Sequence, residues 1–320
     1  MKWHRLQAWI TALFLFSSIA LCACSAQLLE ETDTTTVRVI ATQNFGQELI
    51  FDETVAIDAD TCALEALTQV ASVEQAYGGG FVTAINGICS EYTSDPPVQK
   101  DWFFYINGMQ GNTGALDYIL QPGDIEHWDF HDWGFQTLIP ATTGNLPEPF
   151  RHGYNGAVHP TIITYQNGWE EEAQDIAGRL SQLGIDNAST KSISELSKQE
   201  KESANLLILG TMDCQLILEM NQVWRQLGFY AYFEDDRLVI LNQKGEVAAE
   251  YEAGAGLLQA TQSPWNQKGT LACENVVWMV SGTDEVGIKS AVDVLINQYD
   301  KFQYAYAAVI AQGVIIKIPL

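Results

Sequence analysis

Three alternating side chains near the middle of the chain are of the types needed for metal binding or acid–base chemistry. His127, Asp129 and His131 lie in the stretch Ile-Glu-His-Trp-Asp-Phe-His and are separated by single residues. On a β-strand they share one face, and the two histidines lie about 13 Å apart at about 3.3 Å per residue. A single metal ion cannot reach both side chains without a kink. We therefore predict a solvated polar face and no metal site.

Motifs for catalysis are missing from the sequence. It contains no Gly-x-Ser-x-Gly, His-Glu-x-x-His or Ser-x-x-Lys pattern, and no Cys-x-x-Cys spacing. Adjacent acids such as Asp235 and Asp236 are common in so acidic a chain, and a solvated turn explains them. We predict no catalytic residues, no required cofactor and a protein that is not an enzyme.

The first half of the chain predicts a sheet packed on one helix. Residues 36–42 and 49–57 alternate as strands do, and Asp60-Thr61 precedes a helical apolar pattern. Three aromatic-rich strands are then expected at residues 81–85, 102–106 and 125–131. The order strand–strand–helix–strand–strand–strand predicts an α+β, β-grasp-like N-terminal domain over residues 37–138.

The order of motifs in this domain resembles a known family. The motifs are the helix at 61–67, Thr83-Ala84-Ile85, Trp102, the turn Gly114-Ala115-Leu116-Asp117-Tyr118 and the final aromatic strand. Together they resemble the C-terminal β domain of the transcobalamin and intrinsic factor family, which binds cobalamin. The resemblance covers about residues 37–133. The large helical barrel that completes the corrin site in the eukaryotic transporters has no counterpart here.

The resemblance implies a candidate ligand site near strand ends and turns. Aromatic planes suit a large, flat, partly apolar macrocycle, and backbone groups near strand ends suit its peripheral amides. By contrast, Trp128 and Phe130 share one face of the last strand and are expected in the core. The predicted ligand-binding residues are Thr83, Asn86, Trp102, Tyr105, Tyr118 and Trp133.

The second half of the chain alternates strands and helices. A Pro- and Gly-containing linker over 139–159 precedes strands expected at 161–165, 205–210 and 276–280, and helices at 169–183, 217–227 and 285–296. This alternation predicts an α/β three-layer domain over 160–320, with a mostly parallel sheet. Residues 256–266 and 276–283 also resemble α/β segments of bacterial surface proteins. The Gly-Thr pairs at 210–211 and 282–283 fit turn and helix-cap chemistry.

The N-terminus predicts export and lipidation. Lys2 and Arg5 precede an uncharged, mostly apolar run, which indicates a signal peptide over residues 1–24. Leu21-Cys22-Ala23-Cys24 resembles the lipobox of bacterial lipoproteins, so Cys24 is expected to become the lipidated first residue. Residues 25–36 then form a polar tether. The expected location is extracytoplasmic, anchored by lipid to the bacterial cell membrane.

Charge and cysteines narrow the possible partners. The chain carries 16 basic and 40 acidic side chains, a net charge of −24, which argues against nucleic acid because phosphates require basic patches. An oxidising exterior permits two disulfides, Cys62–Cys89 and Cys214–Cys273, and free buried thiols are the alternative.

Two functions remain open. The first is a tethered binding protein that captures cobalamin or another corrinoid, working with an importer complex. The alternative is a surface interaction or structural lipoprotein that binds glycan or protein. An open aromatic groove between the two domains favours the first function, and a sealed sheet favours the second.

Overall fold

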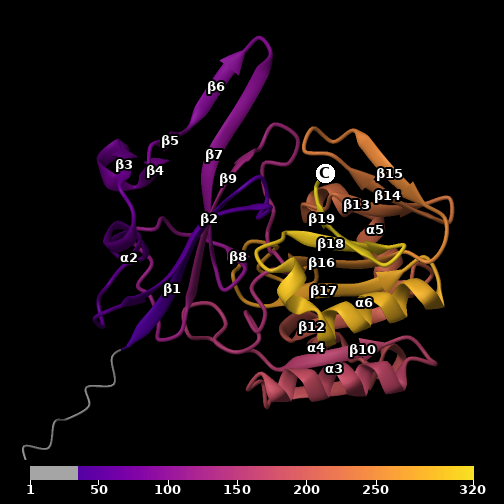
Figure 1. Ribbon diagram of the computed structural model, residues 1–320. Helices are drawn as coiled ribbons and strands as arrows, with labels where there is room; N and C mark the ends of the chain where they lie inside the picture. The colour runs from indigo at the N-terminus through magenta and orange to yellow at the C-terminus, as the bar shows by residue number, and fades with distance from the viewer. Residues whose placement is uncertain (1–34) are drawn as a thin grey trace, which may run out of the picture. The chain divides into compact units, whose positions relative to one another are not determined.

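The protein has a mixed α/β fold with several sheets and few helices (Figure 1). The computed structural model describes residues 35–320, which form one compact unit. The predicted signal peptide, Cys24 and all but the last two residues of the predicted tether lie outside the described residues. We call the elements up to residue 138 the N-terminal lobe and those after residue 160 the C-terminal lobe.

The N-terminal lobe is built on a sheet with the strand order β2-β1-β9-β7-β6. The central pair, β1 and β9, is parallel, and the other pairs are antiparallel. These strands are β1 (Thr36–Gln43), β2 (Glu48–Ala56), β6 (Glu91–Ser94), β7 (Pro97–Ile106) and β9 (Ile125–Asp132); β8 (Met109–Gln110) pairs with β7.

A short helix and a second small sheet complete this lobe. Helix α2 (Ala63–Val70) begins at Cys62, and its Ala63, Leu64, Ala66 and Leu67 are buried against the large sheet. The small sheet has the order β3-β4-β5 and consists of β3 (Val73–Ala76), β4 (Phe81–Ile85) and β5 (Ile88–Cys89). The strands expected at 81–85, 102–106 and 125–131 are therefore confirmed.

The C-terminal lobe contains a seven-stranded sheet with the order β11-β10-β12-β17-β16-β18-β19. The first four strands are mutually parallel, whereas every pair from β17 onwards is antiparallel, so the expectation of a mostly parallel sheet was only half right. The strands are β10 (Thr161–Tyr165), β11 (Ala188–Ser192), β12 (Asn205–Thr211), β16 (Gly256–Gln262), β17 (Val276–Gly282), β18 (Ala307–Ala311) and β19 (Val314–Ile318).

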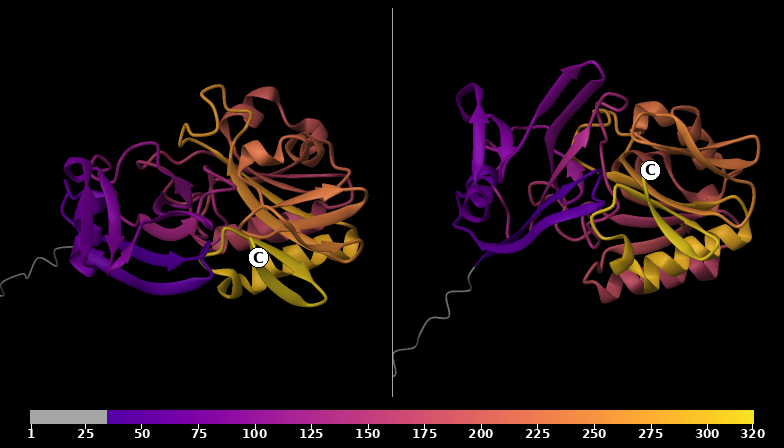
Figure 2. Two further views of the ribbon diagram at one scale, coloured as in Figure 1. Left: turned by 90° about the horizontal axis from the view of Figure 1, so that it is seen from above. Right: turned by 45° about the horizontal axis from the view of Figure 1, so that its top comes forward.

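Helices and a small sheet cover this seven-stranded sheet. Helices α3 (Glu170–Gln182) and α6 (Glu285–Asn297) contact each other and one face of the sheet, as Figure 2 also shows. Helix α5 (Gln215–Gln222) packs on a separate hydrophobic cluster with the small sheet β13 (Ala231–Glu234), β14 (Arg237–Leu241) and β15 (Val247–Tyr251). Helix α4 (Lys198–Ser203) is short. Asp284 caps α6 by accepting a hydrogen bond from the Gly287 N–H, as its Gly-Thr-Asp context predicts.

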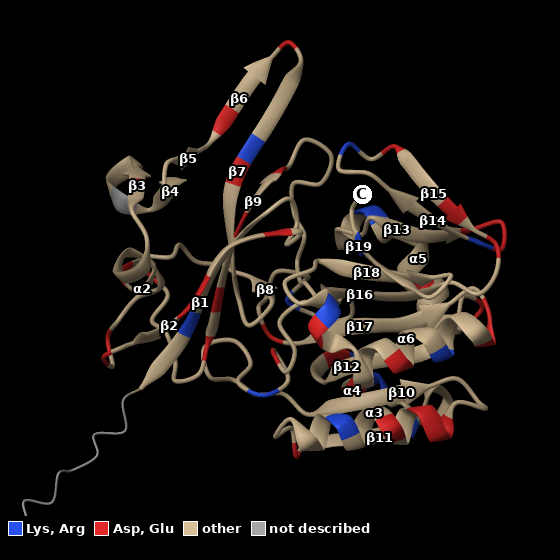
Figure 3. Cartoon of the chain, viewed as in Figure 1, with Lys and Arg blue, Asp and Glu red and all other residues tan. Residues whose placement is uncertain are grey.

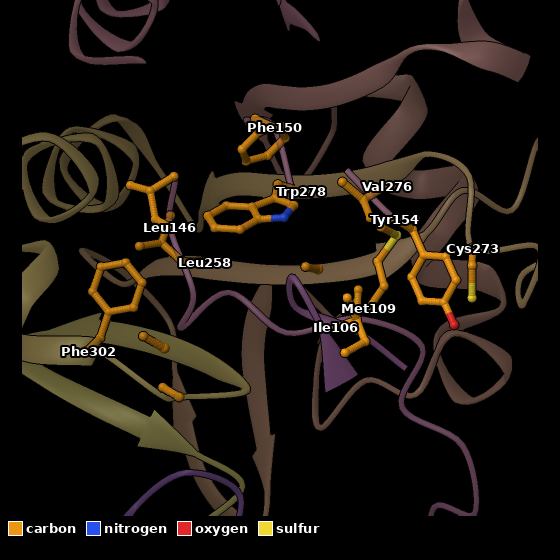
Figure 4. Close-up of a cluster of buried hydrophobic side chains, with 14 of the residues drawn as sticks. Ile106, Met109, Leu146, Phe150, Tyr154, Leu258, Cys273, Val276, Trp278 and Phe302 are labelled. Carbon is orange, nitrogen blue, oxygen red and sulfur yellow. The ribbon is translucent and has the colours of Figure 1, made fainter. Parts of the chain in front are cut away.

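The segment between the lobes is part of the core. Leu146, Phe150 and Tyr154 are buried, and the Phe150 ring lies 5.1 Å from that of Trp278 in β17. Figure 4 shows Phe150 lying against Trp278 and Leu146 beside Leu258, whereas Tyr154 lies near Cys273 and Met109. One continuous hydrophobic cluster therefore joins both lobes.

Gly46 lies in the contact between the two lobes. Its φ is 76°, and an added Cβ would lie 1.8 Å from the carbonyl oxygen of Tyr304. We expect Gly46→Ala to lower the free energy of unfolding by about 3 kcal/mol, since a left-handed residue costs about 1–2 and overpacking about 1–3. Gly87→Ala is the control, because φ is 81° there and nothing lies within 4 Å. Urea denaturation measures both variants, and equal losses would show that the contact at Tyr304 does not matter.

Candidate functional site

Two of the predicted ligand-binding aromatics belong to the hydrophobic core. Trp102 is buried, its indole N–H donates to the Ile88 carbonyl at 2.9 Å, and its ring lies 5.3 Å from Phe130. Tyr118 is buried as well, and its hydroxyl donates to Asp124 and accepts from the Asn155 N–H at 2.9 Å. Both side chains are therefore packed in the core, with their polar groups hydrogen-bonded inside the protein. Their position near strand ends and turns did not make them accessible.

Tyr105 and Trp133 lie apart from these two. Tyr105 is fully buried on the opposite face of β7 from Trp102, and its ring packs edge-on against Tyr306 at 5.3 Å. Burial raises the pKa of the Tyr105 hydroxyl far above its usual range. Trp133 is half-buried beyond the end of β9, where its backbone N–H donates to the Gln99 carbonyl. The four predicted aromatic residues therefore do not form one site.

The polar face of β9 is buried, so the prediction of a solvated face was wrong. His127 and Asp129 are 0% exposed and His131 is 1% exposed. Aromatic rings from both lobes cover this face: Tyr306 of the C-terminal lobe lies 5.4 Å from His131 between ring centroids, and Phe45 of the β1–β2 turn stacks on His131 at 4.4 Å. Strand alternation identifies which residues share a face but not what covers that face.

Asp129 is the centre of the buried polar network. Its carboxylate accepts hydrogen bonds from the Phe45 and Gly46 N–H groups at 3.0 and 2.9 Å, from the Thr42 hydroxyl at 2.5 Å and from His131 Nδ1 at 2.8 Å. Burial raises the pKa of Asp129, but the hydrogen bonds and charges of its partners outweigh burial and lower it overall. The carboxylate is therefore ionised at neutral pH and fixes the β1–β2 turn.

His127 is held neutral in the same network. Because the Thr42 hydroxyl donates to Asp129, it accepts from His127 Nε2 at 2.8 Å, and we assign the imidazole proton to Nε2. His127 Nδ1 is 3.4 Å from the amide nitrogen of Asn145. Burial lowers the pKa of His127 to about 4. All these polar groups act on one another rather than on a ligand.

The aromatic side chains at the contact between the lobes are buried: Phe45 and Tyr105 are 0% exposed and Tyr306 is 3% exposed. The hollow beside this contact is lined by the linker and the C-terminal lobe, at residues such as Ile139, Tyr230 and Tyr306, and has a volume of about 10 Å³. A small-molecule site needs about 300 Å³ or more, and about 10–15 Å³ holds a single water. The aromatic face between the lobes is therefore sealed.

The remaining aromatic surface of the N-terminal lobe lies at the small sheet. Tyr77 is 92% exposed, has a φ of 53°, and meets the Phe81 ring edge-on at 6.2 Å. Phe81 and Thr83 are half-buried and alternate with the buried Val82 and Ala84, so they share the outer face of β4. A left-handed backbone at a tyrosine is uncommon and costs energy, which makes this exposed ring conspicuous.

A second loop adjoins this ring. A Cβ added to Gly114 would lie 3.8 Å from the Gly80 carbonyl oxygen, so the two glycine loops are neighbours. Leu116, two residues further on, is 46% exposed, and the exposed carboxylate of Asp117 next to it borders this loop. We call Tyr77, Phe81, Thr83 and Leu116, together with the glycines of these loops, the uncharged surface.

Charged side chains avoid the strands of this surface. Residues 71–89 contain a single charged side chain, Glu74, although 18% of the whole chain is charged. In Figure 3 the strands β3–β5 are almost entirely tan, whereas α3 and α6 carry many charges. Asn86 is exposed at the far end of β4, but its side chain accepts a hydrogen bond from the Ser72 N–H. Thr83 is thus the one predicted ligand residue within the uncharged surface. Sequence reasoning missed Tyr77, although the near absence of charge was visible.

The four described cysteines are free thiols, so the expected disulfides are not formed. Cys62 is buried at the start of α2, whereas Cys89 is exposed on β5. Cys214 and Cys273 are both buried but belong to different hydrophobic clusters. Each thiol packs with its own neighbours. The alternative of free thiols describes this structure.

Residues 35–320 lack both clusters of metal ligands and helices able to span a membrane. They contain no cluster of three or more His, Cys, Asp or Glu side chains arranged to hold a metal ion. None of the described helices has the length and apolar character needed to cross a bilayer.

One protein-family model matches part of the N-terminal lobe. A family model described as a domain of unknown function, DUF4430, matches residues 60–132. This match lies inside the segment that resembles the transcobalamin β domain and includes the whole of the uncharged surface. No curated protein matches the chain.

Two solved structures show local similarity to the chain. Haptocorrin, in complex with Cbi, is 15% identical with a TM-score of 0.24, and the match covers 31% of this chain and 26% of haptocorrin. A candidate metal-binding protein from Ruminococcus gnavus ATCC 29149 is 19% identical with a TM-score of 0.24, covering 31% of this chain and 97% of that one. The chain thus matches about a quarter of haptocorrin's length.

Proposed function

We propose that the protein is an extracytoplasmic binding protein, anchored through lipid at Cys24, that captures a corrinoid such as cobalamin or cobinamide. The proposal includes a β-grasp-like domain over 37–138, the linker at 139–159 and an α/β three-layer domain over 160–320. It also includes delivery of the ligand to an importer complex.

The uncharged surface is the observation that carries the proposal. A corrin ring is broad and flat, with apolar faces and amide-bearing edges. Tyr77 and Leu116 offer exposed apolar contact area, and Phe81 supports the Tyr77 ring from the side. The glycine loops beside them let a large ligand approach the backbone, whose N–H and C=O groups suit peripheral amides.

The location of this surface also limits affinity. His131 and the polar residues around it are buried in the contact between the lobes, so they offer no surface to a ligand and the uncharged surface must bind it alone. An open surface buries only one side of a macrocycle, so binding is expected to be far weaker than in a two-sided site.

Titration of the mature protein with cobinamide and cobalamin tests the proposal. We expect Tyr77→Ala to weaken corrinoid binding about tenfold, equivalent to about 1.4 kcal/mol, because the most exposed ring of the surface is lost. Val247→Ala is the control, since Val247 is 55% exposed on β15 in the C-terminal lobe, outside the uncharged surface. Isothermal titration calorimetry supplies the dissociation constants. Absence of binding at about 1 mM of either corrinoid would refute the function, because weak open-face binding falls within that range.

The sealed face favours a second candidate function. With His131 and Tyr105 covered, the N-terminal lobe presents the uncharged surface as an open apolar patch rather than a groove. Such patches also serve as contacts for other macromolecules. A glycan-array or pull-down signal that disappears in Tyr77→Ala, from a protein that ignores corrinoids, would support a surface interaction protein instead.

A further inference from the structure

The C-terminal lobe has a hollow of its own, far from β3–β5 in the fold. It has a volume of about 340 Å³ and lies between α5, the 3₁₀ turn Trp224–Leu227 and the loop at 264–270. Sites of about 300–1,000 Å³ accommodate small molecules. Trp265 forms one wall of this hollow.

Trp265 is fixed in place before any ligand arrives. Its indole N–H donates to Glu219 Oε2 at 3.2 Å, and Lys201 Nζ lies 4.3 Å from the ring centroid. Lys201 also donates to Glu219 at 2.6 Å, which closes a triangle of three side chains. The ring therefore loses little conformational entropy when something stacks on it.

The lining of the hollow favours a neutral ligand. Lys201 balances the charge of Glu219, and the other polar residues of the lining, Gln226 and Thr270, are neutral amide and hydroxyl groups. The rest of the wall is apolar: Met220, Val223, Leu227 and Pro264. A ligand with one apolar face and neutral hydroxyls around its edge matches both halves of this lining.

We propose that this hollow binds one neutral pyranose ring, stacked on Trp265. The C–H face of the sugar lies against the indole, and its hydroxyls meet Gln226 and Thr270. The site is independent of the uncharged surface and of the corrinoid proposal. A protein with both sites binds a sugar and a corrinoid without competition.

Saturation-transfer NMR with glucose, galactose, mannose and N-acetylglucosamine tests this site, with glucuronate as the charged comparison. We expect at least one neutral sugar to bind with a dissociation constant in the millimolar range and to bind more tightly than glucuronate. Trp265→Ala should weaken this binding about tenfold, and Trp265→Phe should retain part of it because a ring remains.

Two controls separate the site from effects on folding. Trp224→Ala removes a half-buried indole that stacks on Tyr232 at 4.4 Å and does not line the hollow, so sugar binding should persist. The circular dichroism spectrum of Trp265→Ala should match that of the wild type, which shows that this variant is folded. Failure of all four neutral sugars to bind at about 50 mM, or equal binding by Trp265→Ala and the wild type, would overturn the proposal.

Discussion

Replacing Asp129 with alanine is expected to lower the free energy of unfolding by about 3–5 kcal/mol. The carboxylate accepts from two backbone N–H groups in the β1–β2 turn, at Phe45 and Gly46, and from Thr42 and His131. Truncation leaves these four donors buried without their acceptor. Urea denaturation followed by circular dichroism measures the loss.

Asparagine at the same position separates shape from charge. Asp129→Asn keeps one oxygen acceptor but turns an amide N–H₂ towards other donors. We therefore expect the free energy of unfolding to fall less than in Asp129→Ala. The fall should still exceed about 1 kcal/mol, the usual contribution of one hydrogen bond. Asp60→Ala is the control, since Asp60 is exposed. An Asp129→Ala loss no larger than that of Asp60→Ala would show that the network does not stabilise the β1–β2 turn.

The contribution of Asp129 to stability depends on pH, and the direction of its pKa shift gives the sign of this dependence. The pKa of Asp129 is lowered in the folded protein, so its stabilising effect is present above the unfolded carboxyl pKa and is lost as the pH falls. The wild type and Asp129→Asn should therefore converge in stability under acidic conditions.

Glu126→Gln is expected to stabilise the protein increasingly as the pH rises from about 4.5 to 8. Glu126 is fully buried, and burial raises its pKa to about 8 despite a hydrogen bond from the Trp128 indole at 2.5 Å. A raised carboxyl pKa means that the unfolded chain binds fewer protons across this interval. The wild type thus loses stability with rising pH, and the neutral glutamine does not.

The expected difference grows at up to about 1.4 kcal/mol per pH unit and levels off above the folded pKa. Below pH 4.5 the two proteins should be nearly equal, because a protonated glutamate and a glutamine present similar groups to Trp128. Unfolding curves at pH intervals of one unit measure this slope. Glu53→Gln, at an exposed position of β2, controls for the loss of a carboxylate. If the difference in the free energy of unfolding between the two proteins were the same at every pH, the pKa of Glu126 would not be raised in the folded protein.

The sequence predicts individual elements of this fold well because their signals are local. Strand β4 begins at Phe81 and β9 at Ile125, as residue alternation and β-branched or aromatic content indicate. Helix α6 follows from Asp284 as its cap and an apolar stripe behind it. These features depend on residues within one or two turns of the chain.

Burial between the lobes could not be predicted in the same way. His131 is covered by Phe45 and Tyr306, which lie about 86 and 175 residues away in the sequence, and by Phe103 of the neighbouring strand β7. Nothing in the alternation of β9 distinguishes a face open to water from one covered by another layer. For the same reason Trp102 and Tyr118 were expected to be accessible, but both are buried in the core.

Local sequence patterns also could not predict the direction of the strands in the antiparallel half of the seven-stranded sheet. Strands β16 and β18 are buried along their whole length, and their residues suit buried strands of either direction. Their direction is set by the connections, such as the tight turn at Gln312 and Gly313 between β18 and β19.

Hydrogen–deuterium exchange of the mature protein with and without cobinamide tests most directly where a ligand binds. We predict slower exchange of backbone amides at residues 76–86 and 114–119, which carry the uncharged surface, when cobinamide is bound. Exchange at 127–131 and 304–306, in the sealed contact between the lobes, should not change. Protection at 127–131 or 304–306 without protection at 76–86 would contradict the account, because the ligand would then lie between the lobes.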